Sequence, residues 1–279
     1  MNFGINDIKE ITASMAAYPD MDYSHYALSF LKRRLSYLFT QLNVRRKDQF
    51  YEMLQQPEFR EQVLFNMCVE TTEMFRDPAF WRTLRDKILG HLPDDCQNIW
   101  VPVAASGEEM FSLAILLHEN KLSQKYKIIG QSPSAGRRDY IQAGKINARH
   151  HDINQTNYKR LEDKTAYQEY IQRDNGFCLL GELYRRNIEC RHESFPTTMP
   201  SEEGIGLILF RNVSIYFNQK LTQLVFSQMI DKLMPGGYLV IGTKEQLPAA
   251  FKEALVEVDA TEKIYKKPGF KFKNNHAEY

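Results

Sequence analysis

The chain has 279 residues, of which 43% are hydrophobic and 25% charged, so it can bury the core of a large soluble protein. Its 36 Lys and Arg nearly balance its 35 Asp and Glu, and a net charge of +1 gives no overall field that would favour nucleic acid or an anionic membrane. No apolar run approaches the ~20 residues of a membrane span, so we expect a cytoplasmic protein without membrane insertion.

The cysteines and histidines form no metal-binding pattern. The four cysteines include no CxxC pair, and the seven histidines show neither HxxxH nor HExxH spacing. We therefore predict free thiols in a reducing compartment and no bound metal.

The sequence pattern of residues 1–92 predicts helices and no strands. Asn6 and Asp7 can cap a first helix that ends before Pro19, and the most regular amphipathic stripe in the chain runs from Leu28 to Leu42. Further short helices are predicted at residues 49–54, 59–67 and 79–89.

The amphipathic helix also has a basic side. Its polar face and the residues just after it contain Arg33, Arg34 and Arg46. Such charge runs are usually a solvated helix face, and the alternative is a docking surface for an acidic partner. The docking interpretation gains weight only if the rest of the chain acts on a protein.

From residue 93 onward the pattern changes to alternating strands and helices. The predicted strands are residues 99–103, 126–129, 205–210 and 238–241, and the predicted helices open at Gly107, span 134–143 and follow Asn218. This order predicts an open parallel sheet of Rossmann type, which binds ligands at the carboxyl ends of its strands. Arg211, Asn212 and Tyr216 follow one strand and are expected on that rim.

Two segments carry weaker signals. Between about residues 147 and 195, short strands at 177–180 and 188–190 predict a small insertion. The tail predicts an antiparallel hairpin of residues 263–265 and 270–272, turned at Pro268 and Gly269. The expected organisation is a helical domain with a linker helix, residues 1–92, followed by an α/β domain, residues 93–279, with an insertion at about 147–195.

Four stretches, taken together and in order, carry a resemblance to a known family. They are TEMFRDP at 72–78, AASGEEMFSLAILL at 104–117, LFRNVSIYF at 209–217 and MPGGYLVIG at 234–242. They resemble the CheR family of chemoreceptor glutamate methyltransferases over nearly the whole chain. The resemblance implies an all-helical N-terminal domain and a Rossmann-like domain that binds S-adenosylmethionine and carries a small β insertion.

The resemblance also implies a reaction and a partner. The protein would transfer the methyl group of S-adenosylmethionine to glutamate side chains of chemoreceptors or receptor-like helical proteins. Such a partner favours the docking interpretation of the basic residues. We expect a monomer with no nucleic-acid partner.

By match to the family's motifs, Arg76 would orient the substrate carboxylate and Tyr216 would lie near the sulfonium. The alternatives are a surface ion pair of Arg76 with Asp77 and a tyrosine in the core. The expected cofactor-binding residues are Thr72, Arg76, Glu108, Glu109, Ser132, Ser194, Phe195, Asn212 and Val213.

Several expected cofactor positions depart from the family's pattern. Val103 stands where the family has a small residue, and its branched side chain would crowd a close backbone approach to ligand. Ser132 stands where the family has an acidic residue that accepts hydrogen bonds from the ribose hydroxyls. Ser194 and Phe195 replace an Asn-Leu pair near the adenine. Compensation by Gln131 at the ribose, and by Phe195 at the adenine, is one possible outcome.

Two functions besides the enzyme therefore stay open. One is a catalytically degenerate relative that acts as a receptor-binding or signalling module with weak or no cofactor binding. The other is a methyltransferase-fold protein with a different small-molecule ligand. Retention of Arg76, Asn212 and Tyr216 favours the enzyme, whereas Val103, Ser132 and Ser194 favour the module.

Overall fold

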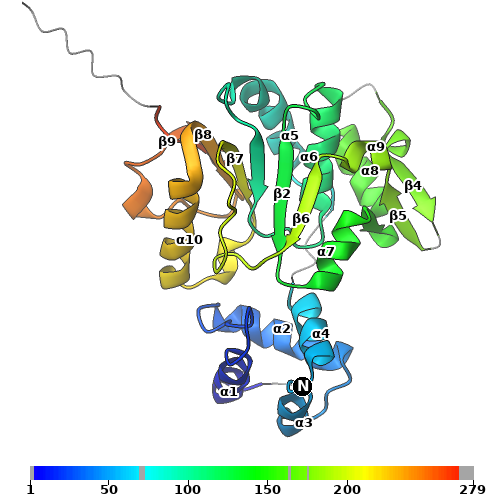
Figure 1. Ribbon diagram of the computed structural model, residues 1–279, viewed down its shortest axis with the longest axis vertical. Helices are drawn as coiled ribbons and strands as arrows, with labels where there is room; N and C mark the ends of the chain where they lie inside the picture. Colours follow the sequence, from blue (N-terminus) through cyan, green and yellow to red (C-terminus); the bar gives the residue numbers. More distant parts are fainter. Residues whose placement is uncertain (1–2, 69–72, 163–164, 175, 270–279) are drawn as a thin grey trace, which may run out of the picture.

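The computed structural model describes residues 3–68, 73–162, 165–174 and 176–269. Figure 1 shows a lobe of helices below a larger lobe, in which helices flank a sheet and a small second sheet lies at the side. The expected fold class is confirmed: a helical N-terminal region is followed by a Rossmann-like α/β region with a small β insertion. None of the described helices is long and apolar enough to span a membrane.

The helical lobe has one apolar core of its own. Its helices are α1 (Ile5–Met15), α2 (Leu28–Gln41), α3 (Lys47–Met53) and α4 (Pro57–Met67). At the centre of this core the rings of Phe39 and Phe50 stack with centroids 4.9 Å apart. The predicted capping role is confirmed for Asp7, whose carboxylate accepts a hydrogen bond from the backbone N–H of the N-cap residue Gly4 (2.9 Å). Asn6 lies inside the helix, because α1 begins at Ile5.

The main sheet has the strand order β6-β2-β1-β7-β8-β10-β9. Its strands are β1 (Asn98–Val101), β2 (Lys127–Ser132), β6 (Ile188–His192), β7 (Ile205–Phe210), β8 (Leu233–Ile241), β9 (Val256–Asp259) and β10 (Ile264–Lys266). The first five strands in that order are parallel, and β10 is antiparallel to both of its neighbours. All six residues of β7 are buried, as expected for a parallel strand that is covered on both faces.

Helices cover both faces of this sheet. On one face pack α5 (Pro78–Thr83), α6 (Glu108–Glu119) and α7 (Ala135–Gln142), and on the other packs α10 (Gln219–Lys232). The two crossovers β1-α6-β2 and β7-α10-β8 bring the carboxyl ends of these strands to one edge. Leu28, the first residue of the predicted amphipathic stripe, is 44% exposed.

The insertion has a small sheet of its own. β3 (Lys145–Asn147), β5 (Phe177–Leu180) and β4 (Ile171–Asp174) form an antiparallel sheet, accompanied by α8 (His151–Lys159) and α9 (Glu182–Arg185). Residues 188–190 were expected in the insertion, but they belong to β6, which pairs in parallel with β2. A short alternating strand has the same pattern at the edge of either sheet, so the sequence does not distinguish the two.

The C-terminal pairing also differs from the prediction. Residues 264–266 form β10, as the strand signal indicated, but β10 lies between β8 and β9. Residues 270–272, the other half of the predicted hairpin, lie outside the described residues.

Short turns of helix complete the secondary structure. They are the π turn η1 (Leu84–Ile88) and the 3₁₀ turns η2 (Leu89–His91), η3 (Ala148–His150), η4 (Tyr167–Glu169), η5 (Ser214–Tyr216) and η6 (Ala249–Phe251). The side chains of α5, η1 and η2 pack in the same cluster as the sheet rather than with α1 to α4. We therefore propose that the structural boundary lies between α4 and α5, whereas residue 92 marks a change in sequence pattern.

A carboxylate from the helical lobe caps a helix of the other lobe. Glu61 in α4 accepts hydrogen bonds from the hydroxyl of Ser134 (2.6 Å) and the backbone N–H groups of Ala135 (3.2 Å) and Gly136 (2.9 Å), at the start of α7. Arg137, also in α7, is buried with its guanidinium 3.8 Å from the ring centroid of Phe65. An acidic side chain at a helix N-terminus is favourable for the helix dipole, so this contact fixes one lobe against the other.

Replacing Glu61 with Gln should lower the free energy of unfolding by about 1–2 kcal/mol, because an amide accepts the hydrogen bonds of the α7 start less well than a carboxylate does. Urea unfolding followed by circular dichroism would measure the change. The control is Glu58→Gln, an exposed glutamate in the same helix. Equal stability of the two variants would contradict a capping role for Glu61.

Candidate functional site

A pocket of about 340 Å³ opens between the helical lobe and the carboxyl edge of the main sheet. One wall comes from the loops after β1, β2 and β7, through Val103, Pro133 and Asn212, and from Gln131 near the end of β2. The opposite wall comes from the segment between α1 and α2, through Asp22 and Tyr26. The volume is in the range of small-molecule sites, which is about 300–1,000 Å³. The pocket lies at the edge where parallel sheets bind ligands.

The loop between β1 and α6 makes a sharp turn next to the pocket. Ala105 and Gly107 have φ angles of 48° and 96°, in the left-handed region. A side chain at Gly107 would also meet Ile141 and Phe111 at 3.0 Å, so glycine is required there. Val103, which was expected to crowd a ligand, forms part of the pocket wall.

The two glutamates that begin α6 form contacts with other residues of the fold rather than facing the pocket. Glu108 is 2% exposed and accepts a hydrogen bond from the Ser106 hydroxyl. Glu109 forms an ion pair with Arg211 (2.9 Å). Burial raises the pKa of both carboxyls, and the contacts with Ser106 and Arg211 oppose that effect. Both side chains lie outside the lining of the pocket.

Arg211, at the end of β7, is the centre of a buried ion network. Its side chain is 2% exposed, and its guanidinium bonds Asp77 (2.8 Å) and Glu109 (2.9 Å) and lies 4.0 Å from the ring centroid of Phe80. The network joins the starts of α5 and α6 to the end of β7. Because Asp77 is paired with Arg211, the alternative of a surface pair between Arg76 and Asp77 is wrong.

Arg76 lies between two residues with left-handed backbone. Phe75 and Asp77 have φ angles of 54° and 57°, a costly conformation for residues other than glycine. The hydroxyl of Ser112 accepts from the Phe75 N–H (2.8 Å), and the Arg76 carbonyl accepts from the Trp81 indole (2.9 Å). Within the described residues, the Arg76 guanidinium makes no hydrogen bond or ion pair. The described contacts thus hold the backbone of Arg76 and leave its guanidinium without a partner among the described residues.

The loop after β7 turns through Asn212, whose φ is 60°. The backbone N–H groups of Asn212 (2.7 Å), Val213 (2.9 Å) and Ser214 (2.7 Å) all donate to the buried carboxylate of Glu245. Asn212 and Val213 line the pocket immediately beyond this loop.

Tyr216 lies where the two lobes meet. It lines the pocket, and its ring centroid is 4.6 Å from that of Phe30 in α2. Its carbonyl accepts a hydrogen bond from the N–H of Ala27 (2.8 Å), beside a β-bridge between Tyr26 and Phe217. Its ring therefore both packs against the helical lobe and faces the pocket.

Gln131, the residue named for the alternative of compensation at the ribose, uses most of its hydrogen-bonding groups within the fold. It is 1% exposed, and its amide group donates to Glu193 (2.8 Å) and to the carbonyl of Thr198 (3.0 Å). Its oxygen accepts from the Trp100 indole (3.0 Å). Only the second lone pair of that oxygen is left for a ligand.

The neighbouring positions divide between core and pocket. Ser132 is fully buried, with its hydroxyl 3.4 Å from the Ser134 carbonyl, and it lies outside the pocket lining. Phe195 lines the pocket and packs edge-on against Trp100, with centroids 5.3 Å apart. Ser194 lines the pocket beside it.

The helical lobe adds two acidic side chains that the sequence did not indicate. Asp20 and Asp22 line the pocket together with the rings of Tyr23 and Tyr26. Hydrogen bonds from Ser24 lower the pKa of Asp22, so its carboxylate stays ionised near neutral pH. These residues come from a loop without periodic pattern, so nothing in the sequence pointed to them. This wall is acidic and aromatic, a favourable environment for a cationic ligand.

The predicted site residues are only partly brought together. Those that line the pocket are Ser194, Phe195, Asn212, Val213 and Tyr216. Those outside its lining are Arg76, Glu108, Glu109 and Ser132. Thr72 lies outside the described residues.

The three basic residues of the expected docking surface differ in environment. Arg33 and Arg46 are exposed, and Arg46 makes only an exposed ion pair with Asp48 (3.5 Å) among the contacts described. The Arg34 guanidinium is half-buried, donates to the carbonyl of Cys68 and lies 4.7 Å from the ring centroid of Tyr37. Arg34 therefore makes contacts within the helical lobe in addition to contributing charge to its surface.

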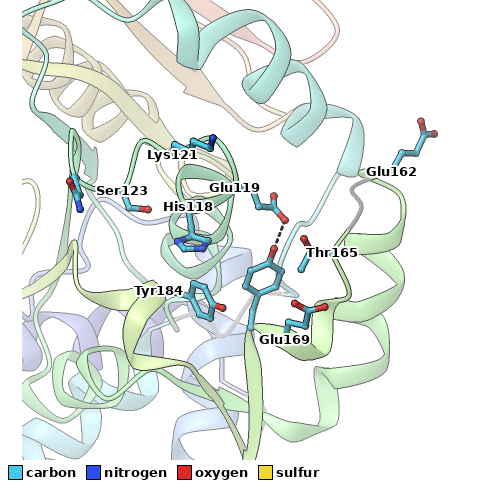
Figure 2. A pocket seen from close by; sticks show the side chains of 10 residues that line it. His118, Glu119, Lys121, Ser123, Glu162, Thr165, Glu169 and Tyr184 are labelled. Atoms are coloured by element: carbon cyan, nitrogen blue, oxygen red, sulfur yellow. Dashed lines mark hydrogen bonds between the residues drawn. The ribbon is translucent and has the colours of Figure 1, made fainter.

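A second hollow, of about 870 Å³, lies between the end of α6 and the insertion. Figure 2 shows Glu119, Glu162 and Glu169 among the side chains that line it. The Glu119 carboxylate accepts a hydrogen bond from the Tyr170 hydroxyl (2.8 Å). Burial raises the pKa of Tyr170 to about 12, so its hydroxyl remains a donor. Among the residues described, no group of three or more His, Cys, Asp or Glu is placed to hold a metal ion, here or elsewhere. All four cysteines are free, as predicted.

Comparisons with known proteins agree with the sequence motifs. A family model described as "CheR methyltransferase, SAM binding domain" matches residues 70–264. The Pseudomonas putida protein named Cher3 is 25% identical over 249 residues, 88% of this chain and 91% of that protein. A chemotaxis protein methyltransferase of Listeria innocua is 25% identical over 233 residues, 81% and 85% of the two chains. One from Vibrio parahaemolyticus is 25% identical over 197 residues, 68% and 70%.

Replacing Arg211 with Met should lower the free energy of unfolding by about 3 kcal/mol, because Asp77 and Glu109 lose the cation between them. The loss should shrink from about pH 8 to about pH 5, since Glu109, whose pKa burial already raises, is then neutralised by a proton. Urea unfolding at both pH values would test this, with the exposed Arg186→Met as control. A loss that is independent of pH would argue against the network.

Proposed function

The chain belongs to the CheR methyltransferase family, and on that premise we propose that it transfers the methyl group of S-adenosylmethionine to glutamate side chains of a chemoreceptor or receptor-like helical protein. The observation that carries this proposal is the pocket at the carboxyl edge of the sheet. Its lining includes four residues of the RNVSIYF stretch, Asn212, Val213, Tyr216 and Phe217.

The chemistry of the pocket fits S-adenosylmethionine. The ligand carries a cationic sulfonium, and the pocket presents the carboxylates of Asp20 and Asp22 and the faces of several aromatic rings. Val103 and Phe195 add an apolar surface suited to a purine base. The poorest match is the ribose, because Ser132 is buried and Gln131 offers one lone pair. We propose that Asn212, Val213, Ser194, Phe195 and the two aspartates hold the cofactor.

When bound, S-adenosylmethionine supplies a methyl group activated by the sulfonium, and its transfer to a carboxylate releases a neutral thioether. The protein needs no general base, because a glutamate substrate is already ionised near pH 7. The residues of the site therefore act by orienting the carboxylate and excluding water, and such approximation can contribute about 7–11 kcal/mol.

Arg76 is proposed to orient the substrate carboxylate. Its guanidinium is available within the described structure, and its backbone is held between Phe75 and Asp77. A charge-assisted bidentate contact from arginine suits a carboxylate. The acidic wall formed by Asp20 and Asp22 would repel the same carboxylate, so the substrate and the cationic cofactor are expected at different ends of the site.

Tyr216 is proposed to complete the site from the joint between the lobes. Its ring is fixed against Phe30 and its carbonyl is bonded to Ala27, so the hydroxyl is carried on a rigid frame. A tyrosine at this place can stabilise the sulfonium through its ring or its hydroxyl.

Isothermal titration should show micromolar binding of S-adenosylmethionine and S-adenosylhomocysteine, and the wild-type protein should label a chemoreceptor cytoplasmic domain with a base-labile methyl ester.

Replacing Tyr216 with Phe should lower turnover by about tenfold or more and change the Kd of S-adenosylhomocysteine little. Tyr37→Phe, on the surface of α2, is the control. Absence of binding at millimolar ligand by a folded protein would reject the proposal.

For the partner, we propose that Arg33 and Arg46 help to dock an acidic face of the receptor. Reversing both to Glu should weaken association with the receptor domain by about tenfold and reduce its dependence on salt. Lys9→Glu combined with Lys252→Glu makes the same change in net charge elsewhere on the exposed surface. Arg34 is left intact, because its reversal would also break its contact with Cys68. If both double variants lost the same affinity for the receptor domain, the change in net charge alone would explain the loss, and the docking role of Arg33 and Arg46 would be rejected.

A further inference from the structure

We propose that Glu245 is the positioning residue of the pocket, and that its buried carboxylate sets the conformation in which the loop after β7 presents Asn212, Val213 and Tyr216. The inference rests on the proposed function, because it assigns Glu245 a role in binding the cofactor. Glu245 itself lies outside the lining of the pocket, so it acts through the loop.

The carboxylate of Glu245 accepts five hydrogen bonds. One oxygen accepts from the N–H groups of Asn212 (2.7 Å) and Gly242 (2.6 Å). The other accepts from the N–H groups of Val213 (2.9 Å) and Ser214 (2.7 Å) and from the Ser214 hydroxyl (2.7 Å). The side chain is 3% exposed, so these donors take the place of water around the charge.

The backbone around the carboxylate is shaped for an anion. Asn212 is left-handed at φ 60° and Val213 is right-handed at φ −113° and ψ −48°, so successive N–H groups converge on one point. Such a concave arrangement of amides is an anion-binding nest. Here the anion is a side chain of the protein, and it offsets the cost of left-handed backbone at Asn212.

A second strand end closes the arrangement. Gly242 follows β8, and a side chain there would lie 2.8 Å from both the Asn212 amide oxygen and the Glu245 carboxylate. The glycine therefore allows the ends of β7 and β8 to approach the same carboxylate. The carboxylate joins two neighbouring strand ends at the edge where the pocket lies.

The loop transmits this arrangement to the pocket. Asn212 and Val213 are wall residues, and Ser214 begins the turn η5 that ends at Tyr216. The N–H of Tyr216 donates to the carbonyl of Val213 (3.1 Å), so the tyrosine is linked by two short steps to the carboxylate. Without the anion, the three converging N–H groups would lose their acceptor, and Asn212 could relax to a right-handed conformation.

The test is Glu245→Gln, which keeps the shape of the side chain but turns one oxygen into a donor that faces N–H groups. Three quantities are measured: thermal unfolding, hydrogen exchange of peptides covering residues 210–217 and 242, and the Kd of S-adenosylhomocysteine by titration. Glu253→Gln, an exposed glutamate nearby in the chain, is the control.

We expect Glu245→Gln to remain folded, to exchange faster in the 210–217 peptide but not in α1 to α4, and to bind S-adenosylhomocysteine at least tenfold more weakly than the control. A folded variant with wild-type affinity overturns the proposal. So does a uniform rise in exchange across the chain, which indicates a purely structural role. If the wild type itself fails to bind, the proposed function has failed, and the assignment of Glu245 fails with it.

If Glu245→Gln does not fold, Ser214→Ala removes one of the five donors and keeps the carboxylate. It should weaken S-adenosylhomocysteine binding by about two- to fivefold and raise exchange locally. Faster local exchange without any change in affinity would overturn the proposal, because the loop would then be shown to move without effect on the pocket.

Discussion

The buried guanidinium of Arg211 is the interaction on which the functional edge of the sheet depends. It draws Asp77 and Glu109, from the starts of α5 and α6, to the end of β7. An arginine keeps its charge when buried, so both carboxylates must stay beside it. The segment that carries Arg76 is thereby held at the edge of the sheet, although its backbone lies between two left-handed residues.

Two adjacent residues of the same loop have opposite electrostatic surroundings. The side chain of Arg211 is a cation held by two carboxylates, and the backbone of Asn212 is part of a nest held by the carboxylate of Glu245. The chain can therefore turn sharply at the end of β7 with the charge of Arg211 paired and the backbone N–H groups of Asn212, Val213 and Ser214 hydrogen-bonded. Arg211 and the Glu245 carboxylate are both buried, so water screens their electrostatic interactions only weakly.

The pocket belongs to both lobes. The sheet provides the loops of a parallel α/β fold, and the segment between α1 and α2 provides Asp20, Asp22 and several aromatic rings. Ser132 is buried outside the pocket lining, and the acidic side chains that line the pocket, Asp20 and Asp22, come from the helical lobe. Contacts such as that of Glu61 with the start of α7 keep the lobes together, and they therefore also set the shape of the pocket.

The sequence by itself determined the fold class, the positions of the main strands along the chain and the family. Strand and helix periodicities and the four motifs are local patterns, so they can be read without the tertiary structure. It did not determine that residues 188–192 pair with β2, that Asp77 binds Arg211 rather than Arg76, or that Asp20 and Asp22 reach the pocket. Those outcomes depend on which segments meet across the sheet and between the lobes. Partners distant in the chain leave no periodic signal, so only the tertiary structure decided them.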